Sequence, residues 1–227
     1  MPAASNAARE IDRLVSVPDA ADWASPPSVA GWAQDRLADL AARPGLLADL
    51  LQEALADPGQ GESYPHMDKV VLWRSGDGAL RLRLHAFGPG YADRPHNHRW
   101  SFAAVLLAGS YLHTLYGGQD EVLAAARAGR EPAPQYAGRQ PAGPGYFLHD
   151  AAVHSLRVDE PTVSLILRGP AVKERYFTIV PGAAGVADRL EWSQGAARET
   201  ADQAAAKRIT AAGLRRVAAA LQAAGAK

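Results

Sequence analysis

The sequence contains no cysteine. This absence excludes disulfide bonds, thiolate metal ligands and a cysteine nucleophile, and it is compatible with a reducing cytoplasm. Lysine plus arginine equals aspartate plus glutamate at 24 each, so no basic surplus favours nucleic acid as a partner. The chain has no run of about 18 apolar residues, and its first residues lack the pattern of a signal peptide. We therefore expect a cytoplasmic protein with neither a nucleic-acid partner nor a membrane span.

What the chain does have is helical periodicity at both ends. A length of 227 residues suits one large domain or one domain with extensions. We expect residues 1–66 to form an irregular arm and a helical cover, and residues 183–227 to form a loop and one long helix. The helices are expected near 11–15, at 28–42 and 44–56, where leucines recur at helical spacing, and at 197–224.

Between residues 67 and 182 the hydrophobic period changes from helical to alternating. The segment 117–142 is rich in proline and glycine and is interpreted as an insertion, in which 120–128 suits either a short helix or a strand pair. Many short strands separated by turn residues are typical of a sandwich or barrel. The strands are expected at 70–73, 80–87, 100–107, 111–116, 146–149, 152–158, 162–167 and 175–180.

Two histidine clusters carry most of the functional information. His96 and His98 are two residues apart, so an extended backbone places both imidazoles on one face. That arrangement suits two ligands of one metal ion. A second cluster, His149 and His154, follows about fifty residues later.

The first cluster resembles the first sequence motif of the cupins. Gly90 is followed by five residues, then by His96 and His98, and Gly109 closes the motif at the expected distance. Phe102 stands where cupins usually have a glutamate ligand.

The second cluster fits the second cupin motif in part. Gly143 and His154 have the expected spacing, whereas His149, Ala151 and Val158 replace the usual proline, glycine and asparagine.

This resemblance implies a mainly β fold, the cupin double-stranded β-helix or jelly-roll barrel, with α-helical extensions at both ends. It also implies a metal held by His96, His98 and His154. Without the glutamate, three neutral imidazoles leave the metal its full charge and open coordination positions. Known three-histidine cupins, such as thiol dioxygenases and ring- or diketone-cleaving dioxygenases, commonly hold iron(II), although imidazole also suits zinc, nickel, copper and, in other cupins, manganese.

Several residues keep alternative interpretations. His96 and His98 are solvated loop residues if the barrel has lost its metal. His149 is a fourth ligand, an acid or base near the metal, or a hydrogen-bonded strand residue. Phe102 would be an apolar wall of the pocket. His85 and His113 are interpreted as structural or pocket-lining residues.

Candidate substrate contacts are weaker in the sequence. Arg81 and Arg83 share one face of an alternating strand, and Arg168 ends a later strand. If these side chains point into the barrel, they suit a bidentate clamp on a carboxylate; the ordinary alternative is a solvated face. Tyr111 and Tyr146 are candidate hydrogen-bond donors, with packing as the alternative role.

The sequence thus predicts a mononuclear non-heme iron(II) oxygenase that takes dioxygen and a small polar metabolite, such as an amino acid, a thiol or a natural-product intermediate. One alternative is a non-oxidative isomerase or lyase with another metal as Lewis acid. A second alternative is a ligand-binding cupin without activity. The apolar faces of the terminal helices suit either packing on the barrel or a homodimer.

Overall fold

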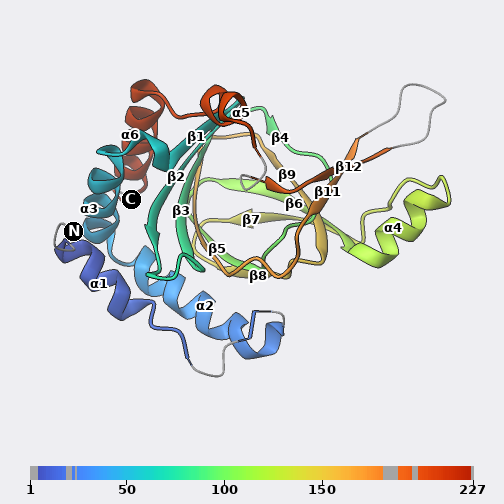
Figure 1. Ribbon diagram of the computed structural model, residues 1–227, viewed down its shortest axis with the longest axis horizontal. Helices are drawn as coiled ribbons and strands as arrows, with labels where there is room; N and C mark the ends of the chain where they lie inside the picture. Colours follow the sequence, from blue (N-terminus) through green and yellow to red (C-terminus); the bar gives the residue numbers. More distant parts are fainter. Residues whose placement is uncertain (1–4, 19–21, 24, 181–188, 196–198, 226–227) are drawn as a thin grey trace.

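Two antiparallel sheets face each other across the middle of the protein in a computed structural model (Figure 1). The structure describes residues 5–18, 22–23, 25–180, 189–195 and 199–225. The six-stranded sheet has the order β1-β2-β3-β10-β5-β8 and the four-stranded sheet the order β4-β9-β6-β7, while β11 and β12 form a separate pair. The strands are β1 (Gly61–Tyr64), β2 (Met67–Arg74), β3 (Arg81–Phe87), β4 (Tyr91–Ala92), β5 (Phe102–Ala108), β6 (Ser110–Gly118), β7 (Tyr136–Pro141), β8 (Tyr146–Leu148), β9 (Ala152–Val158), β10 (Thr162–Arg168), β11 (Tyr176–Val180) and β12 (Arg189–Ser193).

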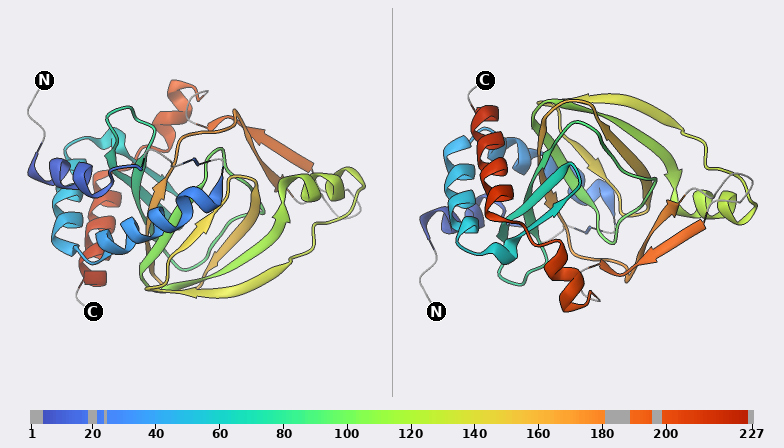
Figure 2. Two further views of the ribbon diagram at one scale, coloured as in Figure 1. Left: turned by 90° about the horizontal axis from the view of Figure 1, so that it is seen from below. Right: turned by 90° about the horizontal axis from the view of Figure 1, so that it is seen from above.

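Helices from both ends of the chain cover the outer face of the six-stranded sheet (Figures 1 and 2). The C-terminal helix α6 packs beside α3, although the two lie far apart in the sequence. The short helix α4 projects from the opposite end, between β6 and β7. The helices are α1 (Asn6–Leu14), α2 (Pro26–Ala41), α3 (Pro44–Leu55), the 3-10 turn η1 (Pro58–Gln60), α4 (Gln119–Arg127), α5 (Ala201–Ala206) and α6 (Ala211–Gly225).

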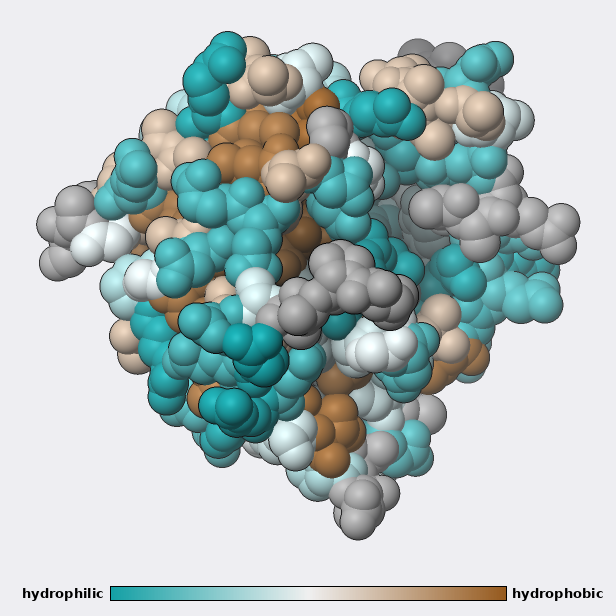
Figure 3. Space-filling view, turned by 60° about the vertical axis from the view of Figure 1, so that its left-hand side comes forward, coloured by the Kyte–Doolittle hydropathy of each residue, from teal (hydrophilic) through white to brown (hydrophobic). Residues whose placement is uncertain are grey.

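The main hydrophobic core lies between these helices and the six-stranded sheet. It is built from apolar residues on the inner faces of the helices and on the outward face of the strands, among them Leu37, Leu50, Leu82, Leu84 and Val217. From the helix-covered side that comes forward in Figure 3, hydrophilic residues dominate the surface, and hydrophobic residues gather in its upper left part. No helix in the described ranges is long and apolar enough to cross a membrane.

Strand β3 turns its leucines toward the helices and its charged residues toward the barrel interior. Leu82 and Leu84 are fully buried in the main core, whereas Arg81, Arg83 and His85 line the cavity between the sheets. The alternation was expected, and the charged face lines the cavity and not the outer surface of the barrel. The helical cover supplies the apolar environment, so the polar face of the strand must lie inside the barrel.

The mainly β architecture with helices at both ends confirms the expected fold class. The expected boundaries differ in detail, however. The six-stranded sheet already begins at β1, before the predicted start at residue 67, and β7 joins the four-stranded sheet within the segment interpreted as an insertion. The segment 120–128 is helical, as one of its two interpretations required.

The single C-terminal helix expected at 197–224 is wrong, because two helices, α5 and α6, are separated around Ile209. The backbone N–H of Ile209 donates to the carbonyl of Gly61, and Arg208 forms a β-bridge with Glu62. This contact with β1 interrupts the helix, and the Thr210 hydroxyl then accepts from the N–H of Gly213 in the first turn of α6. Residues 197 and 198 lie outside the described residues. Likewise, α2 begins earlier than expected, because Pro26 occupies its first turn.

Candidate metal centre

A cavity of about 1060 Å³ occupies the space between the two sheets. Side chains from both sheets and from the segment before β5 line it. Most of the residues singled out in the sequence meet here: His96, His98, His154, Arg81, Arg83, Arg168, Phe102, Tyr111 and Tyr146.

Backbone pairing holds the first histidine against the third. His96 and His154 exchange two N–H···O=C hydrogen bonds, each of 2.9 Å, across an antiparallel bridge. His154 belongs to β9, which also pairs with β6. His96 and His154 are far apart in the sequence, and they are neighbours because the backbone pairs in this register.

Asn97 anchors the extended segment that carries the two histidines. Its side chain is fully buried on the side opposite the imidazoles, as alternation of an extended chain requires. The amide oxygen accepts from the N–H of Phe177 at 2.9 Å, and the amide nitrogen donates to Gln119 at 3.0 Å. These contacts fix the backbone that carries His96 and His98.

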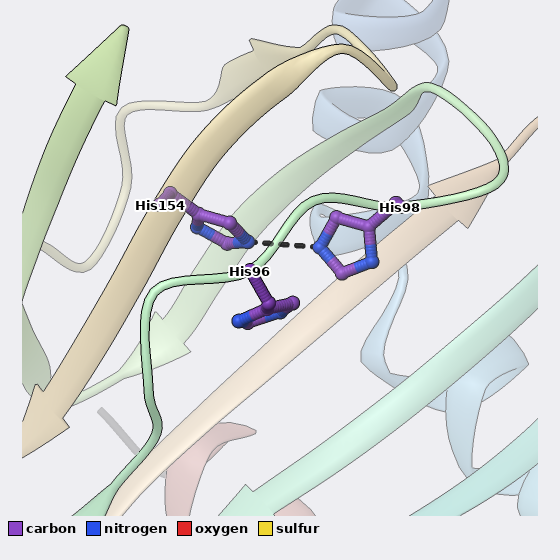
Figure 4. Close-up of side chains that lie close together, drawn as sticks. All are labelled: His96, His98 and His154. Carbon is purple, nitrogen blue, oxygen red and sulfur yellow. Dashed lines mark hydrogen bonds between the residues drawn. The ribbon is translucent and has the colours of Figure 1, made fainter. Parts of the chain in front are cut away.

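The three imidazoles converge on one point at the cavity wall (Figure 4). One ring nitrogen from each of His96, His98 and His154 lies within 4.8 Å of the others. Nε2 of His98 is 2.8 Å from Nε2 of His154, and the ring centroid of His96 lies 4.7 Å from both other centroids. No aspartate or glutamate belongs to this group in the part of the chain that the structure describes.

Hydrogen bonds on the far side of two rings direct their Nε2 atoms toward this point. Nδ1 of His96 donates to the carbonyl of Arg94 at 2.8 Å, which leaves the Nε2 lone pair free. Nδ1 of His154 lies 2.9 Å from Nε2 of His113, and both rings are buried. When the Nδ1 proton of His154 is donated to His113, the Nε2 lone pair of His154 also faces the cluster.

Burial keeps the imidazoles of His98, His154 and His113 neutral. It lowers the pKa of His98 and of His154 well below the usual value, and the neighbouring His96 adds to the effect. Burial likewise lowers the pKa of His113 to about 4. Neutral imidazole is the form that binds metal ions.

One pair of these nitrogens has the spacing that two ligands of a divalent transition-metal ion require. Two nitrogens bound at about 2.1 Å and at a right angle are about 3.0 Å apart, close to the His98–His154 separation of 2.8 Å. Two nitrogen lone pairs at that distance repel each other unless a proton or a cation lies between them. A metal ion would displace that proton, because ligation requires both lone pairs.

Two aromatic rings shield the imidazoles on the side of β5. Trp100 stacks on His98 with a centroid distance of 4.7 Å, and Phe102 meets the same ring edge-on at 5.2 Å. Phe102 is buried. At the position of the usual cupin glutamate, the site therefore has an apolar wall instead of a carboxylate.

Two predicted catalytic residues have different positions. Tyr111 is buried at the cavity, and its hydroxyl lies 2.7 Å from that of Tyr146. His149 is not among the residues that line the cavity; its Nε2 lies 3.4 Å from Asp150 and its Nδ1 accepts from the N–H of Ala151. Tyr146 and Leu148 point inward in β8, so the next residue points away from the metal centre. The structure thus does not bring His149 to the other histidines.

Three residues around the histidine cluster had contacts that the sequence did not predict, although His113 was expected to be structural or pocket-lining. Asn97 was visible only as the residue between two histidines, and Trp100 only as the start of an expected strand. The spacing of His98, Trp100 and Phe102 was a signal for a shared face. His113 had no such signal, because its contact with His154 depends on the pairing of β6 with β9.

No family model matches the sequence, and no curated protein does. Solved structures with a similar fold include KdgF from Halomonas sp. (15% identity, 48% of this chain and 86% of that chain, TM-score 0.37). An RmlC-like cupin from Shewanella frigidimarina NCIMB 400 shares 15% identity over 50% of this chain and 85% of its own (TM-score 0.38). The polyketide cyclase RemF from Streptomyces resistomycificus shares 16% identity over 53% and 74% (TM-score 0.38). At these values the likeness says nothing of activity, and the barrel is assigned from its own strand topology.

Proposed function

We propose that this protein is a metal-dependent enzyme, a mononuclear non-heme iron(II) oxygenase that acts on a small polar molecule. The observation that supports it most is the convergence of three imidazoles on a large cavity, with two Nε2 atoms 2.8 Å apart. His96, His98 and His154 would hold the ion. When bound, iron(II) would supply a redox centre with open coordination positions.

The protein's own contribution begins with a partly shielded site in which hydrogen bonds hold the rings. Trp100 and Phe102 cover one side of the imidazoles and keep water from that side. His113 holds the ring of His154 through its Nδ1, and the carbonyl of Arg94 holds His96. These contacts preorganise the ligands, so little rearrangement is needed when a metal binds.

A pair of tyrosines beside Phe102 and His113 would supply hydrogen-bond donors to the cavity. Burial raises the pKa of Tyr111 and of Tyr146, and the adjoining hydroxyl raises that of Tyr111 further. Both phenols therefore keep their protons at neutral pH and act as hydrogen-bond donors. In this proposal the pair orients an oxygen atom of the substrate, and Tyr111 has the catalytic contact.

The test is metal analysis of protein purified without oxygen, followed by oxygen-consumption assays with amino acids and thiols. We expect near-stoichiometric iron and oxygen uptake that depends on it. His96→Ala and His154→Ala should lose the metal; full occupancy in either variant would contradict the ligand set. Turnover that needs metal but not oxygen would instead support an isomerase or lyase. Metal binding without any turnover would support a ligand-binding protein.

A further inference from the structure

Three arginines form one wall of the cavity, which we call the arginine wall: Arg81, Arg83 and Arg168. Arg81 and Arg168 are direct partners in the β3–β10 ladder, and Arg83 lies on the same inward face of β3. Inward positions in a barrel are usually filled by apolar side chains that pack together. Three cations at such positions therefore require an explanation.

The arginine wall has no acidic partner among the described residues. None of its three side chains forms an ion pair with an aspartate or glutamate, and the Nε of each is buried without a hydrogen-bond acceptor. The terminal nitrogen of Arg168 donates to the carbonyl of Gly169 at 2.8 Å, which neutralises no charge. A buried guanidinium without a counter-charge is unfavourable, so natural proteins rarely keep one without a use.

Two lysines of the same cavity show the contrast. Lys69 and Lys207 both form ion pairs with Glu62, and Lys207 also pairs with Glu199. Burial lowers the pKa of Lys69, yet the two ammonium groups hold the pKa of Glu62 at about 2, so the cluster is ionised and balanced. Ion pairs therefore balance the charges of these lysines, whereas no such pair balances the arginine wall.

The arginine wall is adjacent to the metal centre. The guanidinium carbons of Arg83 and Arg168 each lie 5.4 Å from the ring centre of Trp100. The same indole stacks on His98 at 4.7 Å with an angle of 22° between the planes. One indole ring thus lies between two guanidinium groups and a metal ligand. A single small molecule can therefore contact the arginine wall and the metal at the same time.

Both guanidiniums remain charged at neutral pH. Burial lowers the pKa of Arg83 to about 10 and that of Arg168 to about 9, and repulsion from neighbouring arginines adds to the effect in both. A bound anion would relieve this repulsion. Guanidinium groups bind carboxylates and phosphates with two parallel hydrogen bonds, which matches the unused donors on this wall.

We propose that the arginine wall binds a substrate carrying at least two negative charges, either a phosphate monoester or a dicarboxylate, and holds it beside the metal. This inference deepens the proposed function. It rests on that function only for the statement that the bound substrate contacts the metal. The balanced lysine cluster at the same cavity explains why the anion selects the arginine wall.

The experiment is calorimetric titration of the protein, with and without added metal, with inorganic phosphate and with succinate at low ionic strength. We expect saturable binding of at least one anion; the tighter one identifies the phosphate or the dicarboxylate class. Arg83→Met and Arg168→Met should weaken it by about tenfold or more, and Arg83→Lys by less. The matched control, Arg157→Met, removes an exposed arginine paired with Asp159 and should bind as the wild type does.

Thermal unfolding separates a binding role from a structural one. Because the wall consists of unpaired like charges, Arg83→Met and Arg168→Met should not lower the melting temperature, and a rise of about 2–4 °C is expected. Arginines with a structural role would instead give destabilised variants with unchanged anion affinity.

Failure of this inference is distinguishable from failure of the proposed function. If neither anion binds the wild type, or if Arg83→Met binds both as the wild type does, the inference is overturned, whatever the metal content. If anion binding depends on the arginine wall but the protein takes up no metal, the proposed function fails and the anion site remains.

Discussion

Replacement of His113 by phenylalanine tests whether a buried histidine outside the ligand set controls metal affinity. His113 places Nε2 2.9 Å from Nδ1 of His154, and the two rings are 6% and 2% exposed. The variant keeps an aromatic ring of similar size and removes the hydrogen-bond partner. Because the pKa of His113 is lowered to about 4 by burial, the change removes no charge at neutral pH.

The expected loss follows from the tautomer of His154. Without an acceptor, the Nδ1 proton of His154 is buried and unpaired, which costs about 1–3 kcal/mol. The ring can avoid this by moving its proton to Nε2, but that nitrogen is then no longer a ligand. Either route weakens metal binding, and we expect about 10- to 100-fold, equivalent to about 1.4–2.8 kcal/mol.

The measurement is an anaerobic competition titration with a chromophoric chelator, using iron(II) and a second, redox-inert ion. His149→Phe is the matched control, because it removes a histidine outside the cluster and should leave affinity unchanged. His113→Gln, which keeps an acceptor, should lose less than His113→Phe. A folded His113→Phe protein with wild-type affinity would refute the role assigned to His113.

Two further predictions concern stability. Glu62→Gln should lower the free energy of unfolding at neutral pH by about 1–2 kcal/mol, allowing for solvent screening, as measured by chemical denaturation. Burial alone would raise the pKa of Glu62, but Lys69 and Lys207 hold it at about 2 instead of 4.5. Because the folded-state pKa of Glu62 is depressed, this contribution to stability is complete above pH 4.5 and disappears as the pH falls toward 2. Equal stability of the variant and the wild type at neutral pH would contradict the prediction. Gly109→Ala should cost at least about 2 kcal/mol, because Gly109 has φ +74° and an added Cβ would lie 2.4 Å from the carbonyl oxygen of Pro161; an unchanged melting curve would refute this.

The sequence was sufficient for the fold class and for the convergence of the three histidines. The spacing from Gly90 to Gly109 matched a known motif, and the structure shows why both ends are glycine, since each has a positive φ. The closing glycine also lies against the backbone of Pro161, as the contact above shows. Local chemistry of this kind is readable from one segment.

Features that depend on the pairing of distant segments were not readable. The contact of His113 with His154 exists only because β6 and β9 pair in one register. The helix expected across Ile209 is interrupted by a hydrogen bond to Gly61, and tertiary structure there overrides local helix propensity. His149 was grouped with His154 by proximity in the sequence, yet strand alternation turns it away.

The orientation of β3 links the helical cover to the chemistry of the cavity. Burial of Leu82 and Leu84 against the helices stabilises the fold by about 1.5–3 kcal/mol each. A shift of one residue would turn these leucines into the cavity and force Arg81 and Arg83 against apolar helices, which is unfavourable on both faces. The apolar contact outside the barrel therefore fixes the position of the cations inside it. Because their mutual repulsion cannot be relieved by rotating the strand, a bound anion would relieve it, as the proposed substrate does.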